Sequence, residues 1–280
     1  MIGVITDSNA QLPAEVARRY GIEVVPLTVR IDGVDYLEGV DLDADAFYAR
    51  FESGVPEVST SQPSPGRVAA AYQALAARGA DAILSVHLGS NISGTVNAAT
   101  LAAASSPVPV RVVDTGSASF GVAFAVWEAA EALAAGASVE DAARLAQRVA
   151  AVTGNVFVLR GLELARAGGR LAAGVAEAEA IPVLSVVEGV MRPVGRAQDL
   201  GPAADVMARY VLAAGGRLRV AVGVADRGTV PLAQALEDRL AGRPQVGELM
   251  RYRIGPTSGA HTGPGTFSAY FYDLDKLRGA

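Results

Sequence analysis

The chain contains 280 residues, carries a formal net charge of −5, and has no cysteine and two histidines. The lack of cysteine excludes a disulfide-bonded scaffold, a thiol nucleophile and cysteine-ligated metal centres, and the pI of about 5.2 argues against nucleic acid as the main partner. Hydrophobic residues make up 51% and aromatic residues only 6%, which is enough apolar material for a full core and excludes a disordered chain.

In the first half of the chain, short apolar runs alternate with Ala-rich amphipathic stretches. This alternation predicts an N-terminal α/β domain with a parallel, doubly wound sheet. The strands are predicted at 2–6, 22–31, 82–88 and 108–114. The helices are predicted from 13 onward and at 43–51, 66–78, 95–105, 119–133 and 139–152, and 59–65 is predicted as a polar loop.

The second half lacks regular crossovers and predicts a C-terminal α+β domain with a mixed or antiparallel sheet. Glu188-Gly189 is predicted to form the turn of a hairpin. The domains are predicted at 1–155 and 156–280. The strands are predicted at 155–162, 181–187, 190–194, 219–224, 248–254 and 266–272, and the helices at 205–214 and 230–240.

Two long uncharged stretches, 82–110 and 254–272, are rich in Gly, Pro, Ser and Thr, so neither predicts a transmembrane helix. The N-terminus shows no basic region followed by an apolar stretch of signal-peptide type. We therefore expect a cytoplasmic protein with at most transient contact with a membrane surface.

Hydroxyl side chains cluster with glycine or proline in five loops, three of which follow predicted strands: 6–8, 90–95 and 114–119. Each cluster alone is typical of turns and helix caps, and we expect Asp7 and Asp114 to cap helices. Together, three such loops at the carboxyl edge of a parallel sheet predict a site for a small anion. The other two clusters lie at 59–63 and 261–265.

His261 lies between Gly259-Ala260 and Thr262-Gly263, in what we interpret as a glycine-defined loop, and its imidazole could donate a hydrogen bond to an anion. His87 ends a buried strand and is interpreted as structural. Arg170 follows two glycines, which would fix its guanidinium for a carboxylate or phosphate.

Several enzyme classes lack their motifs. There is no G-x-x-x-x-G-K-[ST] loop and no G-x-S-x-G elbow, and the single lysine is Lys276 in the C-terminal tail. Ser93 or Thr60 with His261, and Asp114 as a third member, could still form a hydrolase or transferase site. An anion-sensing module without lipid is a third alternative.

Taken in order, these clusters resemble the DegV family of bacterial lipid-binding proteins. The resemblance spans essentially the whole chain, and its most specific parts are the stretches at 60–63 and 261–265. The matching stretches are Ile5-Thr6-Asp7-Ser8, Ile92-Ser93-Gly94-Thr95, Val113-Asp114-Thr115, Gly168-Gly169-Arg170, Pro182-Val183-Leu184, Thr60-Ser61-Gln62-Pro63 and His261-Thr262-Gly263-Pro264-Gly265.

This resemblance implies a protein of the EDD fold that binds one long-chain fatty acid between two domains and needs no metal or other cofactor. It implies no catalytic residue in this chain. The bound acid would be presented to a separate fatty acid kinase, which forms acyl phosphate for phospholipid synthesis, and Arg170 would serve that partner step. The implied carboxylate ligands are Thr60, Ser61, Ser93, Gly94, His261 and Thr262.

Overall fold

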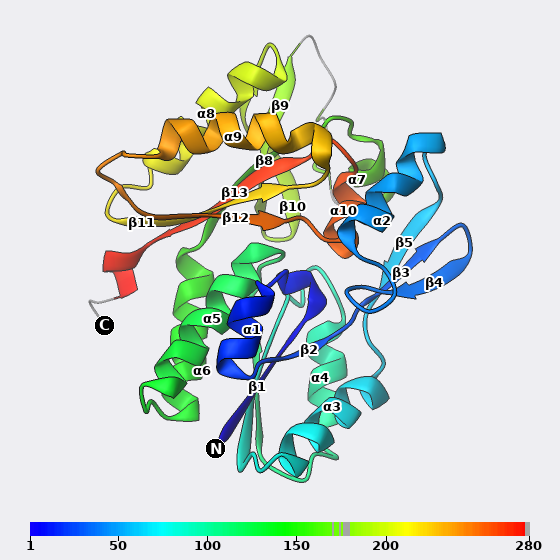
Figure 1. Cartoon of the computed structure of the whole chain (residues 1–280), viewed down its shortest axis with the longest axis vertical. Helices are drawn as coiled ribbons and strands as arrows, with labels where there is room; N and C mark the ends of the chain where they lie inside the picture. Colours follow the sequence, from blue (N-terminus) through cyan, green and yellow to red (C-terminus); the bar gives the residue numbers. More distant parts are fainter. Residues whose placement is uncertain (170, 174, 176–179, 278–280) are drawn as a thin grey trace. The chain divides into compact units, whose positions relative to one another are not determined.

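The computed structural model describes residues 1–169, 171–173, 175 and 180–277, and the chain divides into two compact units (Figure 1). Unit 1 comprises Met1–Arg30, Asp35–Asp41 and Thr60–Ala151, and unit 2 comprises Ile31–Val34, Leu42–Ser59 and Val152–Ala280. Unit 2 therefore takes a segment from early in the chain as well as the whole second half.

Unit 1 is built on a four-stranded sheet in the order β2-β1-β6-β7, in which every pairing is parallel. The predicted parallel α/β sheet is thus confirmed. The core strands are apolar on both faces, as a sheet covered on both sides requires. The strands are β1 (Ile2–Asp7), β2 (Glu23–Val25), β6 (Ala82–His87) and β7 (Val110–Asp114).

Helices cover both faces of this sheet (Figure 1). On one face α3 and α4 bury Val68, Leu75 and Ala99 against Ile5 and Ile83. On the other face α5 packs on β1, β6 and α1, and most of its first ten residues are completely buried. The helices are α1 (Ala14–Tyr20), α3 (Pro65–Ala77), α4 (Thr95–Ala103), α5 (Phe120–Ala134) and α6 (Val139–Val152), with the 3-10 turn η1 (Ser8–Ala10).

Unit 2 is built on a six-stranded sheet in the order β10-β9-β8-β13-β11-β12. All pairings are antiparallel except β11 with β12, so the predicted mixed sheet is confirmed. Glu188 and Gly189 form the predicted hairpin turn with φ of 53° and 79°. The strands are β8 (Gly154–Val158), β9 (Ile181–Val187), β10 (Val190–Ala197), β11 (Leu218–Val224), β12 (Val246–Arg253) and β13 (Phe267–Asp273).

One face of the unit 2 sheet is covered by α8 (Leu200–Leu212) and α9 (Val230–Leu240), which bury Met207 and Leu236 on it (Figure 1). A smaller apolar cluster that includes Phe157 and Leu162 forms around β8, β9 and β10. The short elements of unit 2 carry much of its chemistry. They are α2 (Ala44–Ala49), η2 (Arg50–Ser53), α7 (Glu163–Ala167), η3 (Arg227–Thr229), α10 (Pro256–Thr262) and η4 (Leu274–Leu277).

A third sheet, in the order β4-β3-β5, corrects two predictions. The strand predicted at 22–31 is divided into β2 and β3 (Thr28–Ile31), because Pro26 has no N–H to continue a ladder. The loop predicted at 59–65 begins with a strand, β5 (Val58–Ser61), whose Ser and Thr side chains lack the apolar alternation that marks a strand. The third strand is β4 (Val34–Leu37).

Among the residues that the structure describes, no helix is long and apolar enough to cross a membrane.

Candidate functional site

The strand-end loops of unit 1 are tied to one another by side chains. The Asp114 carboxylate accepts hydrogen bonds from the backbone N–H of Ser90 at 3.1 Å and of Gly116 at 2.9 Å, which joins the loops after β6 and β7. Asn9, after β1, accepts one from the N–H of Ser119 at 2.8 Å. The three loops predicted to meet at one sheet edge therefore do so. Asp114 was expected to cap a helix, and it instead fastens two loops.

Ser93 lies half-buried just before α4, where its hydroxyl is 2.9 Å from that of Thr95 and accepts a hydrogen bond from the Thr95 N–H at 3.3 Å. Thr95 is completely buried, so its hydrogen bonds fix the position of the Ser93 side chain. The position places a hydroxyl beside the N-terminus of a nine-residue helix, whose partial positive charge favours an anion.

The loop that follows Thr60 and Ser61 lies against the Ser93 loop. A Cβ on Gly94 would overlap the side-chain amide of Gln62, so a larger residue there would displace this amide. Thr60 is half-buried at the end of β5 and Ser61 is exposed. Within unit 1, the structure thus brings the Thr-Ser-Gln-Pro stretch next to Ser93-Gly94.

His87 belongs to a buried chain of polar groups. Its Nδ1 lies 2.9 Å from Oδ2 of Asp7, its Nε2 lies 2.7 Å from the Ser85 hydroxyl, and that hydroxyl lies 2.8 Å from the Tyr72 hydroxyl. Asp7 Oδ2 also accepts from the N–H of Leu88 at 3.0 Å. Burial raises the pKa of Tyr72, and its hydrogen bond to Ser85 opposes this.

The hydrogen-bonded side chains of Asp7, His87 and Ser85 follow the Asp-His-Ser order of a hydrolase triad, but all three are 0% exposed. Ser85 is closed off from solvent, and this network pairs polar side chains inside the core. Oδ1 of Asp7 is buried without a hydrogen-bond partner among the described residues. The structural interpretation of His87 agrees with this geometry. Asp7 was expected to cap a helix, and that was wrong: its carboxylate makes no cap hydrogen bond and pairs with the imidazole.

In unit 2, His261 lies in the last turn of the short helix α10 and is half-buried. The prediction of a loop was wrong here. Gly259 packs so closely on Phe47 and Tyr48 of α2 that a Cβ would come within 2.6 Å of the Phe47 ring, and this contact supports a helix of low intrinsic propensity. Gly263, with φ of 74°, ends the helix directly after His261 and Thr262.

The double-glycine stretch lies against this histidine. A Cβ on Gly168 would be 2.8 Å from Nδ1 of His261, so the backbone after α7 is one wall of the imidazole site. Gly169 has φ of 67°, which favours glycine. Arg170, which we predicted to act in a partner step, lies outside the described residues.

The segment after His261 is held by backbone-directed hydrogen bonds. The Thr262 hydroxyl donates to the carbonyl of Ser258 at 3.1 Å, so it can offer a ligand only an acceptor while that bond persists. The Gly265 N–H donates to the Asp226 carboxylate, and Gly265 packs against the Arg160 side chain. These bonds give the His261 segment a defined backbone.

The predicted carboxylate ligands are thus divided between the units: Thr60, Ser61, Ser93 and Gly94 lie in unit 1, and His261 and Thr262 lie in unit 2. Their joint action on one ligand stays a prediction. Sequence reasoning did not identify Gln62 and Gly168 as contact residues, although both lie inside the matching stretches; only their contacts with Gly94 and His261 single them out. Among the described residues, no group of three His, Asp or Glu side chains could hold a metal ion.

A parallel α/β unit followed by a mixed-sheet unit, with hydroxyl-rich loops at the parallel sheet's carboxyl edge, defines the general class of this protein. Residues 1–274 match the profile of the DegV family, which is described as a family of uncharacterised proteins. The chain is 36% identical to a DegV domain-containing protein of Streptomyces coelicolor over 94% of this chain and 95% of that protein. It is 34% identical to one of Deinococcus radiodurans over the same shares. The chain belongs to the DegV family.

Solved structures agree with this assignment. A DegV family protein from Thermus thermophilus, described by its fatty acid binding, matches with a TM-score of 0.88 and 33% identity over 98% of this chain and 99% of that one. DegV from Bacillus subtilis, described as a fatty acid binding protein, matches with a TM-score of 0.86 and 27% identity over 97% and 99%.

Proposed function

We propose that this chain binds one long-chain fatty acid and holds its carboxylate with Thr60, Ser61, Ser93, Gly94 and His261. Thr262 would join them as a donor by giving up its hydrogen bond to the Ser258 carbonyl. The observation that carries the proposal is the match along nearly the whole chain to DegV proteins from Thermus thermophilus and Bacillus subtilis that bind fatty acids.

The local geometry supports the carboxylate assignment in two places. Ser93 is fixed by Thr95 beside the N-terminus of α4, where a carboxylate gains from the helix dipole and a hydroxyl donor. The imidazole of His261 is fixed by Gly168 and by the end of α10. A carboxylate removed from water needs such donors, because an unpaired buried charge is costly.

The acyl chain would supply most of the affinity. Each buried CH₂ group contributes about 0.8 kcal/mol, so a long saturated chain gains several kcal/mol from an apolar cavity. An aliphatic-rich and aromatic-poor composition suits a narrow cavity of this kind. Chain length and unsaturation preference then depend on the side chains that line it.

The first experiment is mass spectrometry of an organic extract from natively purified and then denatured protein. We expect one long-chain fatty acid per chain. A lipid-free protein that also takes up no added fatty acid would contradict the proposal. Turnover of an ester or phosphate that Ser93→Ala abolishes would favour the hydrolase alternative instead.

We further propose that the bound acid is presented to a separate fatty acid kinase that converts it to acyl phosphate, with Arg170 acting in that step. Arg170→Ala should then bind fatty acid normally and support acyl-phosphate formation poorly when a kinase of this type is added. Equal acyl-phosphate yields from Arg170→Ala and wild type would remove Arg170 from the partner step.

A further inference from the structure

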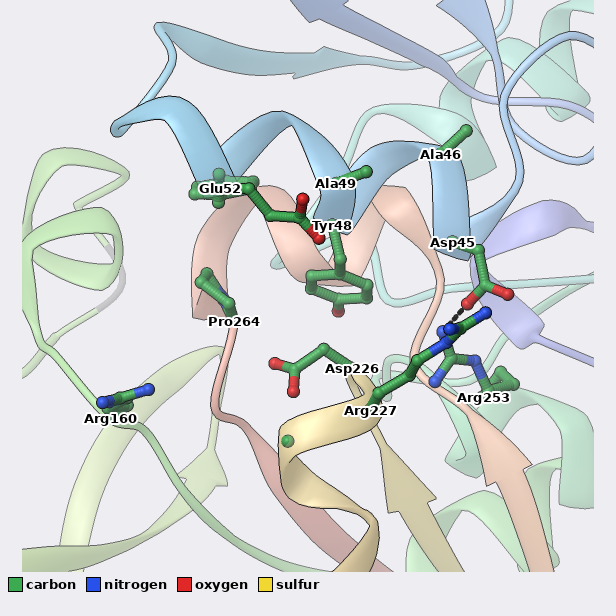
Figure 2. A pocket seen from close by; sticks show the side chains of 12 residues that line it. Asp45, Ala46, Tyr48, Ala49, Glu52, Arg160, Asp226, Arg227, Arg253 and Pro264 are labelled. Atoms are coloured by element: carbon green, nitrogen blue, oxygen red, sulfur yellow. Dashed lines mark hydrogen bonds and ion pairs between the residues drawn. The ribbon is translucent and has the colours of Figure 1, made fainter.

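A cavity lies in unit 2, and none of the six predicted carboxylate ligands lines it. Its volume is about 660 Å³, and it lies between α2, η3, the end of β12 and Pro264 (Figure 2). This volume falls within the range of about 300–1,000 Å³ that is typical of small-molecule sites. All of its lining residues belong to unit 2.

The charges around the cavity cancel in sum but are unevenly distributed. Asp226 is engaged by backbone groups, since its carboxylate accepts from the N–H groups of Thr229 and Gly265. Glu52 and Arg160 lie toward the opposite side from Arg253 (Figure 2).

Near Arg253, two guanidinium groups line the cavity, and only one of them is paired with a carboxylate. Arg253 pairs with Asp45 at 2.5 Å, and Arg227 extends from η3 toward this pair (Figure 2). The exposed Arg227 side chain makes no hydrogen bond or ion pair with any residue that the structure describes. Arg227 therefore presents a fork of N–H donors that has no ion-pair partner among the described residues, and such a fork matches an oxyanion.

The rest of the wall combines apolar and charged residues, and its apolar part includes the aromatic residues Tyr48 and Phe51. Ala46 and Ala49 present exposed methyl groups one turn apart on α2, and Pro264 also lines the cavity (Figure 2). A ligand with an anionic head and a compact apolar body fits both parts of the cavity.

We propose that this cavity is a second ligand site, for a small organic phosphate monoester whose phosphate is held by Arg227 and Arg253. A phosphate monoester suits two neighbouring guanidinium groups because its three free oxygens can accept from both forks at once. The proposal does not depend on fatty acid binding.

The test uses the full-length protein and phenyl phosphate as the probe, followed by the methyl signals of Ala46 and Ala49 in NMR spectra. We expect saturable shifts of these signals, and binding weakened at least about tenfold in Arg227→Gln, which loses a charge-assisted donor set. The matched control is Arg209→Gln, an exposed arginine on α8 outside the cavity, which should bind as wild type.

Two further arms decide the ligand class and the site. Benzoate, of similar size but with a carboxylate, should bind more weakly, and equal binding would overturn the assignment to phosphate esters. Ser93→Ala should leave phenyl phosphate binding intact, and its loss there would show that the probe occupies the predicted carboxylate site. No saturable shift at Ala46 and Ala49, or an Arg227→Gln variant that binds as wild type, would overturn the site itself.

Discussion

The two histidines of this chain lie in opposite environments. His87 in unit 1 is fully buried, and both ring nitrogens lie within hydrogen-bond distance of buried partners, Asp7 and Ser85. His261 in unit 2 is half-buried at the end of a short helix, with the Gly168 backbone against Nδ1. A fully buried imidazole between two bonded partners contributes to stability, whereas a half-buried imidazole at a helix end is placed where a ligand can reach it.

The largest effect should come from His87→Ala. It removes the imidazole from between the buried Asp7 carboxylate, which keeps only the Leu88 N–H, and the Ser85 hydroxyl, which keeps only Tyr72. We expect this to cost about 3–5 kcal/mol in the free energy of unfolding. Chemical denaturation of the wild type and both histidine variants measures this, with His261→Ala expected to lose about 1 kcal/mol or less. Equal losses in the two variants would contradict the comparison.

The order should reverse when fatty acid affinity is measured. Under the proposed function, His261→Ala and Ser93→Ala would each remove a hydrogen bond to the charged carboxylate, so we expect each variant to lose about 1.5–3 kcal/mol of binding free energy. Titration of a fluorescent fatty acid into delipidated protein checks this, and Thr100→Ala, an exposed hydroxyl on α4, is the control. Unchanged affinity in both variants would remove the headgroup assignment.

Gly168→Ala tests whether the backbone after α7 fixes the imidazole. A Cβ there would be 2.8 Å from Nδ1 of His261, so the ring must shift, and we expect fatty acid affinity to fall by about 1 kcal/mol. Gly201→Ala on α8 is the matched control, because nothing lies within 4 Å of its Cβ position. Equal affinities in the two alanine variants would show that Gly168 does not position His261.

The smallest effect concerns the end of the buried chain at Tyr72. Its pKa is raised by burial, so the stability gained from the protonated phenol is fully present below the unfolded pKa of about 10 and is lost as the pH rises through the folded pKa. Tyr72→Phe should remove this alkaline loss and cost about 1 kcal/mol at neutral pH. The free energy of unfolding measured across alkaline pH tests this. The control is Tyr210→Phe, which should still lose stability at alkaline pH as the wild type does.

Most of the regular elements were predictable because their patterns are local. The alternation of apolar runs and Ala-rich helices predicts the parallel sheet of unit 1, and the turn at Glu188-Gly189 predicts the β9–β10 hairpin. Errors arose where a strand has no apolar alternation, as in β5, and where Pro26 interrupts an apolar run. In these places pairing and packing outweigh local propensity.

The candidate site was predictable as a set of residue types and not as an arrangement. Hydroxyl residues after three strands indicated that three loops meet at one edge of the sheet. The structure shows that the Asp114 and Asn9 side chains connect these loops through hydrogen bonds to backbone N–H groups. The helix around His261 was missed because Gly, Ser and Thr have low helix propensity, and its support comes from Gly259 against Phe47, more than two hundred residues earlier in the chain.

The sequence by itself determined the fold class, the DegV membership and the hydroxyl and histidine side chains available for a ligand, because these depend on local periodicity and on ordered motifs. Only the tertiary structure decided that His87 closes a chain from Asp7 to Tyr72, that Gly168 lies against His261, and that Arg227 approaches the Arg253–Asp45 pair. These contacts join residues distant in sequence, and their energies come from burial and close approach, which no local pattern records.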